Sequence, residues 1–278
     1  MSDVRGDSAL DGFRPEFDDL GRAVSVPTRV RRVVSLVPSL TEAVAATRRE
    51  VLVGATDWCS HPADLDVTRV RGTKNPDLAT ITSLRPDIVL ANFEENRDVD
   101  LEALRGAGVP VWTTAIRTVD EALTSLERML TLACRLPRPA WLEEAARAWA
   151  APAPTLRRRA VIPVWRRPWM VVGRDTFTGD VLERLGIDNV FATHPERYPK
   201  IPLTDIMAAR PELAVLPDEP YRFTADDGPE SFPGVDAALV SGRHLTWYGP
   251  SMADARRVLA DQLGFGGSGQ RGRRSTEA

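Results

Sequence analysis

A gapless internal repeat constrains the fold more than any other feature of this sequence. Residues 81–95 read ITSLRPDIVLANFEE, and they align with residues 206–220, which read IMAARPELAVLPDEP. Both copies carry an Arg-Pro-acid step, an apolar run and then a glutamate, Glu94 in the first copy and Glu219 in the second. The step could recur by chance, because it is a short helix-to-strand connection. We favour two similar lobes, each placing one glutamate just past the same strand.

Short apolar runs alternate with helical patterns along the chain, and this alternation predicts parallel sheets covered by helices. The run Ile88–Ala91 is apolar at every position, as a strand covered on both faces requires. Ligands bind beyond the carboxyl ends of such strands, so a carboxylate placed there lies at a cleft rather than in the core. A helix is expected from residue 40, with Ser39 and Glu42 forming a capping box at its start.

Composition shifts suggest the domain boundaries. Pro152 and Pro154 break the chain near its midpoint, and the end of the chain, GGSGQRGRRSTEA, is rich in Gly, Ser and Arg. The predicted parts are a disordered N-terminal tail (1–16), an N-terminal α/β lobe (17–118), a connecting helical segment (119–157), a C-terminal α/β lobe (158–265) and a disordered tail (266–278).

Bulk composition excludes several classes of function. The net charge of −3 gives no basic field for nucleic acid or an anionic membrane, and no apolar stretch reaches the roughly 18 residues of a membrane span. Cys59 and Cys134 form no disulfide framework and are expected to be buried thiols. The first residues show no export signal, which predicts a cytoplasmic monomer, or an exported or cell-envelope protein if the start is mis-assigned.

Several ordered motifs carry a resemblance to a known family. The stretches are LGRAVSVPTRVRRVVSLVPSLTE (20–42), VGATDWCSHP (53–62), GTKNPDL (72–78), LRPDIVLANFEEN (84–96), VWRRPWMVVGRDTF (164–177), ERYPK (196–200), DEPYRF (218–223) and TWYGPS (246–251). In this order they resemble the helical-backbone periplasmic binding proteins of the cobalamin and iron-siderophore type, and most of all the cobalamin-binding branch, the helical backbone metal receptors.

The resemblance implies a fold and a function. The fold is α/β: two Rossmann-like lobes with mostly parallel sheets joined by a long helix, the class III substrate-binding-protein fold. The function is that of a soluble binding protein for a cobalamin-like or other metal-chelate ligand in the interlobe cleft. A corrinoid or another metal chelate is the implied ligand, and no other cofactor is expected.

Two departures from the family pattern bear on the transport role. Importer-bound members carry an exposed glutamate near the start of one helix in each lobe, where this sequence has Ala79 and Thr204. The missing carboxylates put an ABC permease partner in doubt, and favour salvage, storage or sensing. The alternatives are the substrate-binding component of an ABC importer for cobalamin or an iron-siderophore, and an enzyme acting on a tetrapyrrole or nucleotide-like ligand.

Loop residues near the predicted strand ends supply the candidate site. Aromatic rings there suit a planar ligand, acids accept hydrogen bonds from amide arms, and cations bind carboxylate or phosphate. The alternatives are that each ring packs under its own loop and that Arg197 pairs with Glu196. The candidate ligand-binding residues are Trp58, Lys74, Glu94, Glu95, Asn96, Trp165, Arg197, Tyr198, Glu219, Tyr221, Trp247 and Tyr248.

Metal binding and catalysis find little support in the sequence. Asp57, Cys59 and His61 do not form a closed zinc pattern, and His61 is the only candidate axial ligand for a corrinoid cobalt or haem iron. The sequence contains no GxSxG motif, P-loop or GxGxxG fingerprint, and no nucleophile accompanies Glu94 and Glu219. A binding protein is therefore favoured over an enzyme, with no catalytic residue assigned.

Overall fold

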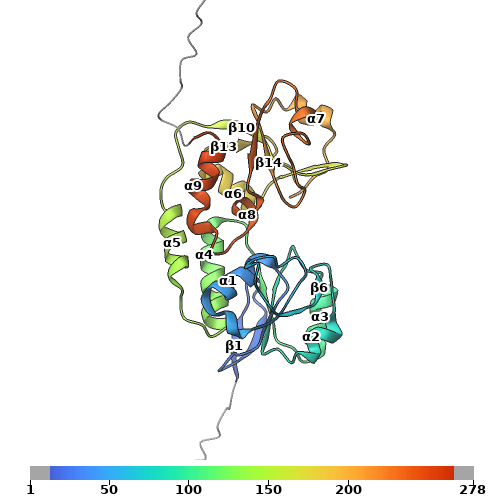
Figure 1. Cartoon of the computed structure of the whole chain (residues 1–278), viewed down its shortest axis with the longest axis vertical. Helices are drawn as coiled ribbons and strands as arrows, with labels where there is room; N and C mark the ends of the chain where they lie inside the picture. Colours follow the sequence, from blue (N-terminus) through green and yellow to red (C-terminus); the bar gives the residue numbers. More distant parts are fainter. Residues whose placement is uncertain (1–12, 266–278) are drawn as a thin grey trace, which may run out of the picture. The chain divides into compact units, whose positions relative to one another are not determined.

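The computed structural model describes residues 13–265, which form two compact α/β units coloured along the chain in Figure 1. Unit 1 comprises the residues up to 115 together with 121–142, and unit 2 comprises 116–120 together with the residues from 143 onward. Each unit contains its own parallel sheet, which confirms the predicted fold class. The segment 119–157, predicted as a separate connector, is instead divided between the two units.

Unit 1 is built on a five-stranded parallel sheet in the order β5-β4-β3-β8-β9. The strands β3, β8 and β9 are buried along their whole length, as expected for strands that begin with apolar residues and are covered on both faces. Two antiparallel pairs, β1-β2 and β6-β7, complete the strands of the unit. The bounds are β1 (Phe13–Phe17), β2 (Ala23–Pro27), β3 (Val33–Ser35), β4 (Leu52–Ala55), β5 (Thr68–Arg69), β6 (Arg71–Gly72), β7 (Asn75–Pro76), β8 (Ile88–Asn92) and β9 (Val111–Thr114).

Helices close the core of unit 1 against this sheet. Ile81 of α2 (Leu78–Ser83) and Leu101 and Leu104 of α3 (Asp98–Gly106) are fully buried in one cluster with Val34 and Val89 of the sheet. Leu101 and Leu104 are three residues apart and so share one face of α3. Burying a leucine of this kind stabilises the fold by roughly 1.5–3 kcal/mol. Between β3 and β4 the chain forms α1 (Pro38–Arg48) and a short 3-10 turn, η1 (Arg49–Val51).

Unit 2 is built on a four-stranded parallel sheet in the order β13-β10-β14-β15. Its core joins β14 to Phe223 and Phe232 of the loop that follows it. An antiparallel hairpin, β11-β12, leaves the sheet after β10. The bounds are β10 (Arg158–Val161), β11 (Pro163–Arg166), β12 (Trp169–Val171), β13 (Ile187–Asn189), β14 (Leu213–Pro217), β15 (Asp236–Val240), α6 (Phe177–Arg184), α7 (Leu203–Ala208), η3 (Pro229–Ser231), α8 (Gly242–Thr246) and α9 (Met252–Gln262).

The sequence repeat corresponds to the same joint between a helix and a strand in each unit, and we call it the Arg-Pro-acid joint. In unit 1 the joint runs from Leu84 to Asp87, between α2 and β8. The Asp87 carboxylate accepts the main-chain N–H groups of Arg31 at 2.7 Å and Arg32 at 2.9 Å. The Arg32 guanidinium donates two hydrogen bonds to the Leu84 carbonyl, at 2.9 and 2.7 Å. The end of α2 and the start of β3 are therefore tied to the start of β8.

Unit 2 repeats the joint with equivalent residues. The Glu212 carboxylate accepts the N–H of Arg159 at 3.0 Å, and the Arg159 guanidinium donates to the Ala209 carbonyl at 2.9 Å. Both joints turn through an arginine with positive φ, Arg85 at 46° and Arg210 at 49°. The two joints share their hydrogen bonds as well as their residues, which favours two copies of one local structure over chance recurrence of a short sequence.

The expected long connecting helix is interrupted. The segment contains α4 (Val119–Arg128), a π-helical stretch, η2 (Met129–Ala133), and α5 (Ala140–Trp149). Pro137 and Pro139 lie between them, and each lacks the N–H that a continuing helix needs. The longest helices in residues 13–265, α1 and α9, have 11 residues each, and none of those described could cross a membrane.

Two local predictions near the N-terminus are wrong. Residues 13–16 were expected in a disordered tail, but they lie in β1, paired with β2 from Phe13↔Pro27 to Phe17↔Ala23. The other parts of the predicted tails, 1–12 and 266–278, lie outside the described residues. The capping box also does not form, because α1 already begins at Pro38 and Ser39 is buried inside it. Proline suits this first position, where its missing N–H has no partner to lose.

Gly186 provides a test of the packing between β10 and the end of α6. It has φ +83°, and a Cβ there would lie 2.7 Å from the Leu156 carbonyl oxygen. We expect Gly186→Ala to lower the free energy of unfolding by at least the roughly 1–2 kcal/mol of left-handed strain. Gly234→Ala is the matched control, because Gly234 has φ +78° with nothing within 4 Å. Equal losses for the two variants in urea unfolding would contradict the close contact.

Candidate ligand-binding site

The loop after β8 is held rigidly by two asparagines. The Asn92 side chain donates to Thr114 Oγ1 at 3.1 Å and accepts the N–H groups of Glu94 at 2.9 Å and Glu95 at 3.3 Å. The Asn96 side chain accepts the Asn92 N–H at 2.9 Å. Buried amides satisfied in this way fix a loop conformation. The two adjacent glutamates therefore leave the strand on a defined turn at the carboxyl end of the sheet.

Asn96 was predicted to contact a ligand, but in the structure its side chain holds two loops together. It is 5% exposed, and its amide nitrogen donates to the Thr73 carbonyl at 3.0 Å. The contact fastens the β6-β7 turn to the loop after β8. An amide that is buried and already hydrogen-bonded has little left to offer a ligand. We therefore assign Asn96 to holding the loop.

Lys74 lies on the β6-β7 turn and reaches the same loop. Its ammonium group donates a short hydrogen bond to the Glu94 main-chain carbonyl. The pKa of Glu95 is raised, because neighbouring protein atoms reduce the hydration of its carboxylate even though part of the residue is exposed. The positive charge of Lys74 opposes this rise in pKa. Lys74, Glu94 and Glu95 thus form one charged cluster at the carboxyl end of β8.

Trp58 lies on the loop after β4 and is 68% exposed. A Cβ on Gly72 would lie 3.3 Å from its indole nitrogen, so the ring approaches the turn that carries Lys74. The nearby His61 has its Nδ1 3.2 Å from the Ser60 hydroxyl. No group of three or more His, Cys, Asp or Glu side chains in residues 13–265 could hold a metal ion. An exposed tryptophan beside a charged turn offers a flat contact surface.

Glu219 follows β14 in unit 2, as Glu94 follows β8 in unit 1, but its environment differs. Its Oε1 atom is buried without a hydrogen-bond partner among the described residues. Burial, and secondly the negative charge of Asp218, raises the pKa of Glu219, while the charge of Arg243 and a hydrogen bond from Trp247 oppose the rise. A Cβ on Gly242 would lie 2.3 Å from Glu219 Cγ, so only glycine allows this approach.

Aromatic rings of unit 2 lie on the β11-β12 hairpin, which carries Trp165, and on loops near the ends of its strands. Trp165 is 44% exposed and packs edge-on against Tyr221, with centroids 5.6 Å apart. The Tyr221 hydroxyl donates to Asp227 at 2.6 Å, which fixes the ring. Tyr198 is 37% exposed, whereas Tyr248 is 8% exposed and packs edge-on against Phe177. Trp165 and Tyr198 thus present exposed ring surface, whereas Tyr248 packs against its neighbours as the sequence left open.

Arg197 makes a different contact from either of its predicted ones. Its Nε donates to the main-chain carbonyl of Asp175 at 2.9 Å, where the chain has a positive φ of 52°. Burial lowers the pKa of Arg197, and the neighbouring Tyr198 opposes that shift. The Gly173 N–H donates to the Arg197 carbonyl at 2.7 Å, so the segment between β13 and α7 that carries Arg197 is fastened to the loop that precedes α6.

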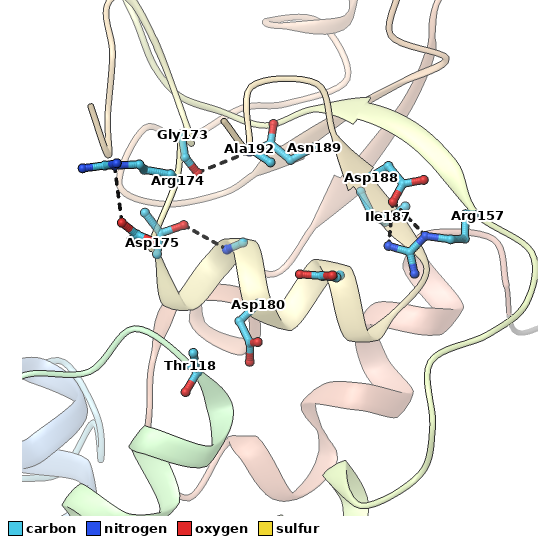
Figure 2. A pocket seen from close by; sticks show the side chains of 13 residues that line it. Thr118, Arg157, Gly173, Arg174, Asp175, Asp180, Ile187, Asp188, Asn189 and Ala192 are labelled. Carbon is cyan, nitrogen blue, oxygen red and sulfur yellow. Dashed lines mark hydrogen bonds and ion pairs between the residues drawn. The ribbon is translucent and has the colours of Figure 1, made fainter. Parts of the chain in front are cut away.

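This loop borders a cavity of about 360 Å³ in unit 2, which sequence reasoning missed (Figure 2). Ion pairs occupy its arginines: Arg157 contacts Asp188 at 2.6 Å, and Arg174 contacts Asp175 at 3.3 Å. None of the predicted site residues lines the cavity. The sequence signal for this cavity is the motif GRDTFTGD (173–180), which supplies several of its lining residues. Within this motif Thr176 caps α6 by accepting the Gly179 N–H at 3.1 Å.

The geometry defines a two-unit α/β ligand-binding protein with strand-end loops that carry exposed rings and charges. The periplasmic binding protein family matches residues 33–219, and the chain belongs to this family. The vitamin B12-binding protein of Pectobacterium carotovorum subsp. carotovorum (strain PC1) is 26% identical over 207 residues, which are 70% of this chain and 74% of that protein.

Solved structures share the fold. The periplasmic heme-binding protein RhuT from Roseiflexus sp. RS-1 matches with a TM-score of 0.70 and 19% identity, covering 84% of this chain and 98% of RhuT. Helicobacter pylori CeuE with bound Ni(II) matches with a TM-score of 0.75 and 14% identity, covering 91% of this chain and 90% of CeuE. Vitamin B12, heme and nickel thus appear among the ligands named for proteins similar to this one.

Family membership corrects the predicted location. The cytoplasmic prediction is wrong, because the family and its matched relatives are periplasmic binding proteins. That prediction rested on the residues at the start of the chain, and the start of a sequence does not by itself decide export. The doubt about a permease partner also gains no support. Ala79 and Thr204 do lie in the first turns of α2 and α7, but Asp205 adds a carboxylate beside Thr204.

Glu219 gives a pH-dependent test of its buried carboxyl group. Because its pKa is raised in the folded protein, its favourable contribution is present while it is protonated and is lost as pH rises through the raised pKa. Glu219→Gln should therefore raise the melting temperature at pH 7, with the gain shrinking as pH falls toward the ordinary glutamate pKa of about 4.3. Calorimetric melts against pH measure this gain. The exposed Glu183→Gln is the control, and identical profiles for both variants would contradict the burial of Glu219.

Proposed function

We propose that this protein binds a corrinoid or another metal chelate in the cell envelope, as the receptor of an importer. The observation that supports the ligand class most directly is the set of exposed rings beyond the strands of the main sheets: Trp58 and Tyr198 on loops, and Trp165 on the β11-β12 hairpin that follows β10. Rigid rings provide contact area with little entropy lost on binding, and the flat part of a tetrapyrrole-like ligand matches them.

Charged groups near the rings support a ligand with polar arms. In unit 1 we propose that Lys74, Glu94 and Glu95 contact amide or carboxylate groups of the ligand. In unit 2 we propose the same role for Arg197, Glu219 and Trp247, with Tyr221 supporting Trp165. Corrinoids carry amide arms around their ring, whereas heme carries carboxylates, so the balance of acids and cations bears on the choice between them. The vitamin B12-binding relative favours the corrinoid.

Titration calorimetry with three probes tests the ligand class. Cyanocobalamin, hemin and nickel-histidine are each titrated into the full-length protein at pH 7. We expect cyanocobalamin to bind most tightly. Tighter binding of hemin or nickel-histidine would overturn the corrinoid assignment while keeping the chelate class, and no binding of any probe would overturn both.

Trp165 tests the role of the exposed rings. Trp165→Ala should weaken the affinity for the bound probe by roughly 1–3 kcal/mol, because a stacked indole loses its buried apolar area. The matched control is Leu156→Ala in the same unit, since Leu156 is 69% exposed and lies outside the strand-end loops. An affinity change no larger than that of the control would remove Trp165 from the site.

The importer role has its own test at the starts of α2 and α7. Ala79→Glu with Thr204→Glu should strengthen retention of the protein on a cobalamin-type permease in nanodiscs, because each new carboxylate adds attraction to a basic permease surface. Thr82→Glu is the control, on an exposed residue of α2. Retention that does not differ between the double variant and the control would argue against docking through these helix starts.

A further inference from the structure

A second cavity, in unit 1, is lined mainly by cations. Its volume is about 450 Å³, within the range of small-molecule sites. Four of its nine lining residues are the arginines Arg29, Arg31, Arg48 and Arg135, and its one acid is Glu50. None of the predicted ligand-binding residues lines it. Arg29 and Arg31 precede β3, so the cavity lies at the amino ends of the strands, away from the strand-end loops.

The arginines differ in how far acids already neutralise them. Arg48 lies 3.6 Å from Glu50, and both side chains are at least half exposed. Arg29 and Arg31 make no side-chain ion pair with any other residue of the range 13–265. Two guanidinium groups two residues apart repel each other unless an anion lies nearby. The cavity therefore carries positive charge that the described part of the chain does not balance.

The main chain of the segment that carries Arg29 and Arg31 is fixed in place. The Arg31 N–H is fixed by the Asp87 carboxylate of the Arg-Pro-acid joint at 2.7 Å. Val30, between Arg29 and Arg31, is 7% exposed and anchors the segment in the core. Preorganisation of this kind lowers the entropy lost when a ligand binds.

Arg135 adds a partly buried cation to the wall. Its Nη1 contacts Glu16 at 2.8 Å and its Nε donates to the Pro27 carbonyl at 3.3 Å. Its Nη2 is buried and has no hydrogen-bond partner in the described chain. Val51 and Leu136 supply apolar lining that is 6% and 5% exposed, and such surroundings strengthen the pull of a guanidinium on an anion.

We propose that this cavity binds a phosphate-bearing anion. Guanidinium groups recognise phosphate through paired N–H donors, and several of them match a group with two or more negative charges. The volume exceeds that of a single phosphate, so a diphosphate or a phosphorylated organic molecule fits better than inorganic phosphate. The phosphate group belongs either to a soluble compound or to a lipid headgroup.

Inorganic pyrophosphate is the probe for the shared chemistry. We expect wild-type protein to bind it with an affinity that falls as salt rises, because arginine–phosphate contacts are screened. The double variant Arg29→Gln with Arg31→Gln should bind about tenfold or more weakly, as expected when charge-assisted hydrogen bonds are lost. Arg85→Gln, on an exposed arginine of the same unit outside the cavity, should bind like wild type. Failure of wild type to bind pyrophosphate, or equal binding by the double variant, would overturn the proposal.

Vesicle sedimentation separates the two sources of phosphate. Co-sedimentation with phosphatidylglycerol vesicles but not with phosphatidylcholine vesicles, reversed by pyrophosphate and lost in the double variant, identifies a lipid headgroup. Pyrophosphate binding without co-sedimentation identifies a soluble phosphate compound. Co-sedimentation that pyrophosphate does not reverse, or that the double variant retains, would place any lipid contact outside this cavity and overturn the lipid assignment. Arg29 and Arg31 are both exposed, so the double variant should keep its core intact. We expect it to bind cyanocobalamin as wild type does, which would show that the phosphate cavity and the proposed ligand site act separately.

Discussion

The Arg-Pro-acid joint is the interaction on which the positions of both sets of loops depend. In each unit an acid next to the proline accepts one or two main-chain N–H groups at or just before the start of the neighbouring strand. An arginine at the same place donates to a carbonyl at the end of the helix. Each contact is an exposed, charge-assisted hydrogen bond, which is stronger than a neutral one. The joint sets where β8 and β14 begin, and the strand length then sets where Glu94 and Glu219 emerge.

Equal positions on the two strands do not give equal chemistry. Lys74 contacts the main chain of Glu94, so the loop after β8 carries an organised cation beside its acids. Gly242 packs closely against Glu219, and the Oε1 atom of Glu219 is buried without a hydrogen-bond donor among the described residues. The repeat therefore conserves the framework, while the residues around each glutamate decide whether it is solvated or withdrawn from water.

Much of the fold followed from the sequence, because apolar runs such as Ile88–Ala91 are typical of a strand covered on both faces. The strand Ile187–Asn189 was missed, since it is short and partly polar and is held by pairing with β10. The break at Pro137 and Pro139 was underestimated, and β1 was missed because its pairing with β2 depends on tertiary context. The rings and charges of the candidate site were chosen by their position near predicted strand ends, and their contacts with a ligand stay a prediction. Asn96 and Tyr248 could not be assigned, because their burial depends on Thr73 and Phe177, which are distant in the sequence.

The chemistry of the joint has a consequence for how such proteins diversify. The side chains that fasten helix to strand lie at the amino ends of β8 and β14, whereas the candidate recognition loops follow the carboxyl ends. Substitutions in the loops can therefore accumulate without loosening the scaffold, and the scaffold need not be rebuilt when the cargo changes. A fold organised in this way is a natural starting point for engineered sensors, in which grafted loops would supply new selectivity on an unaltered frame.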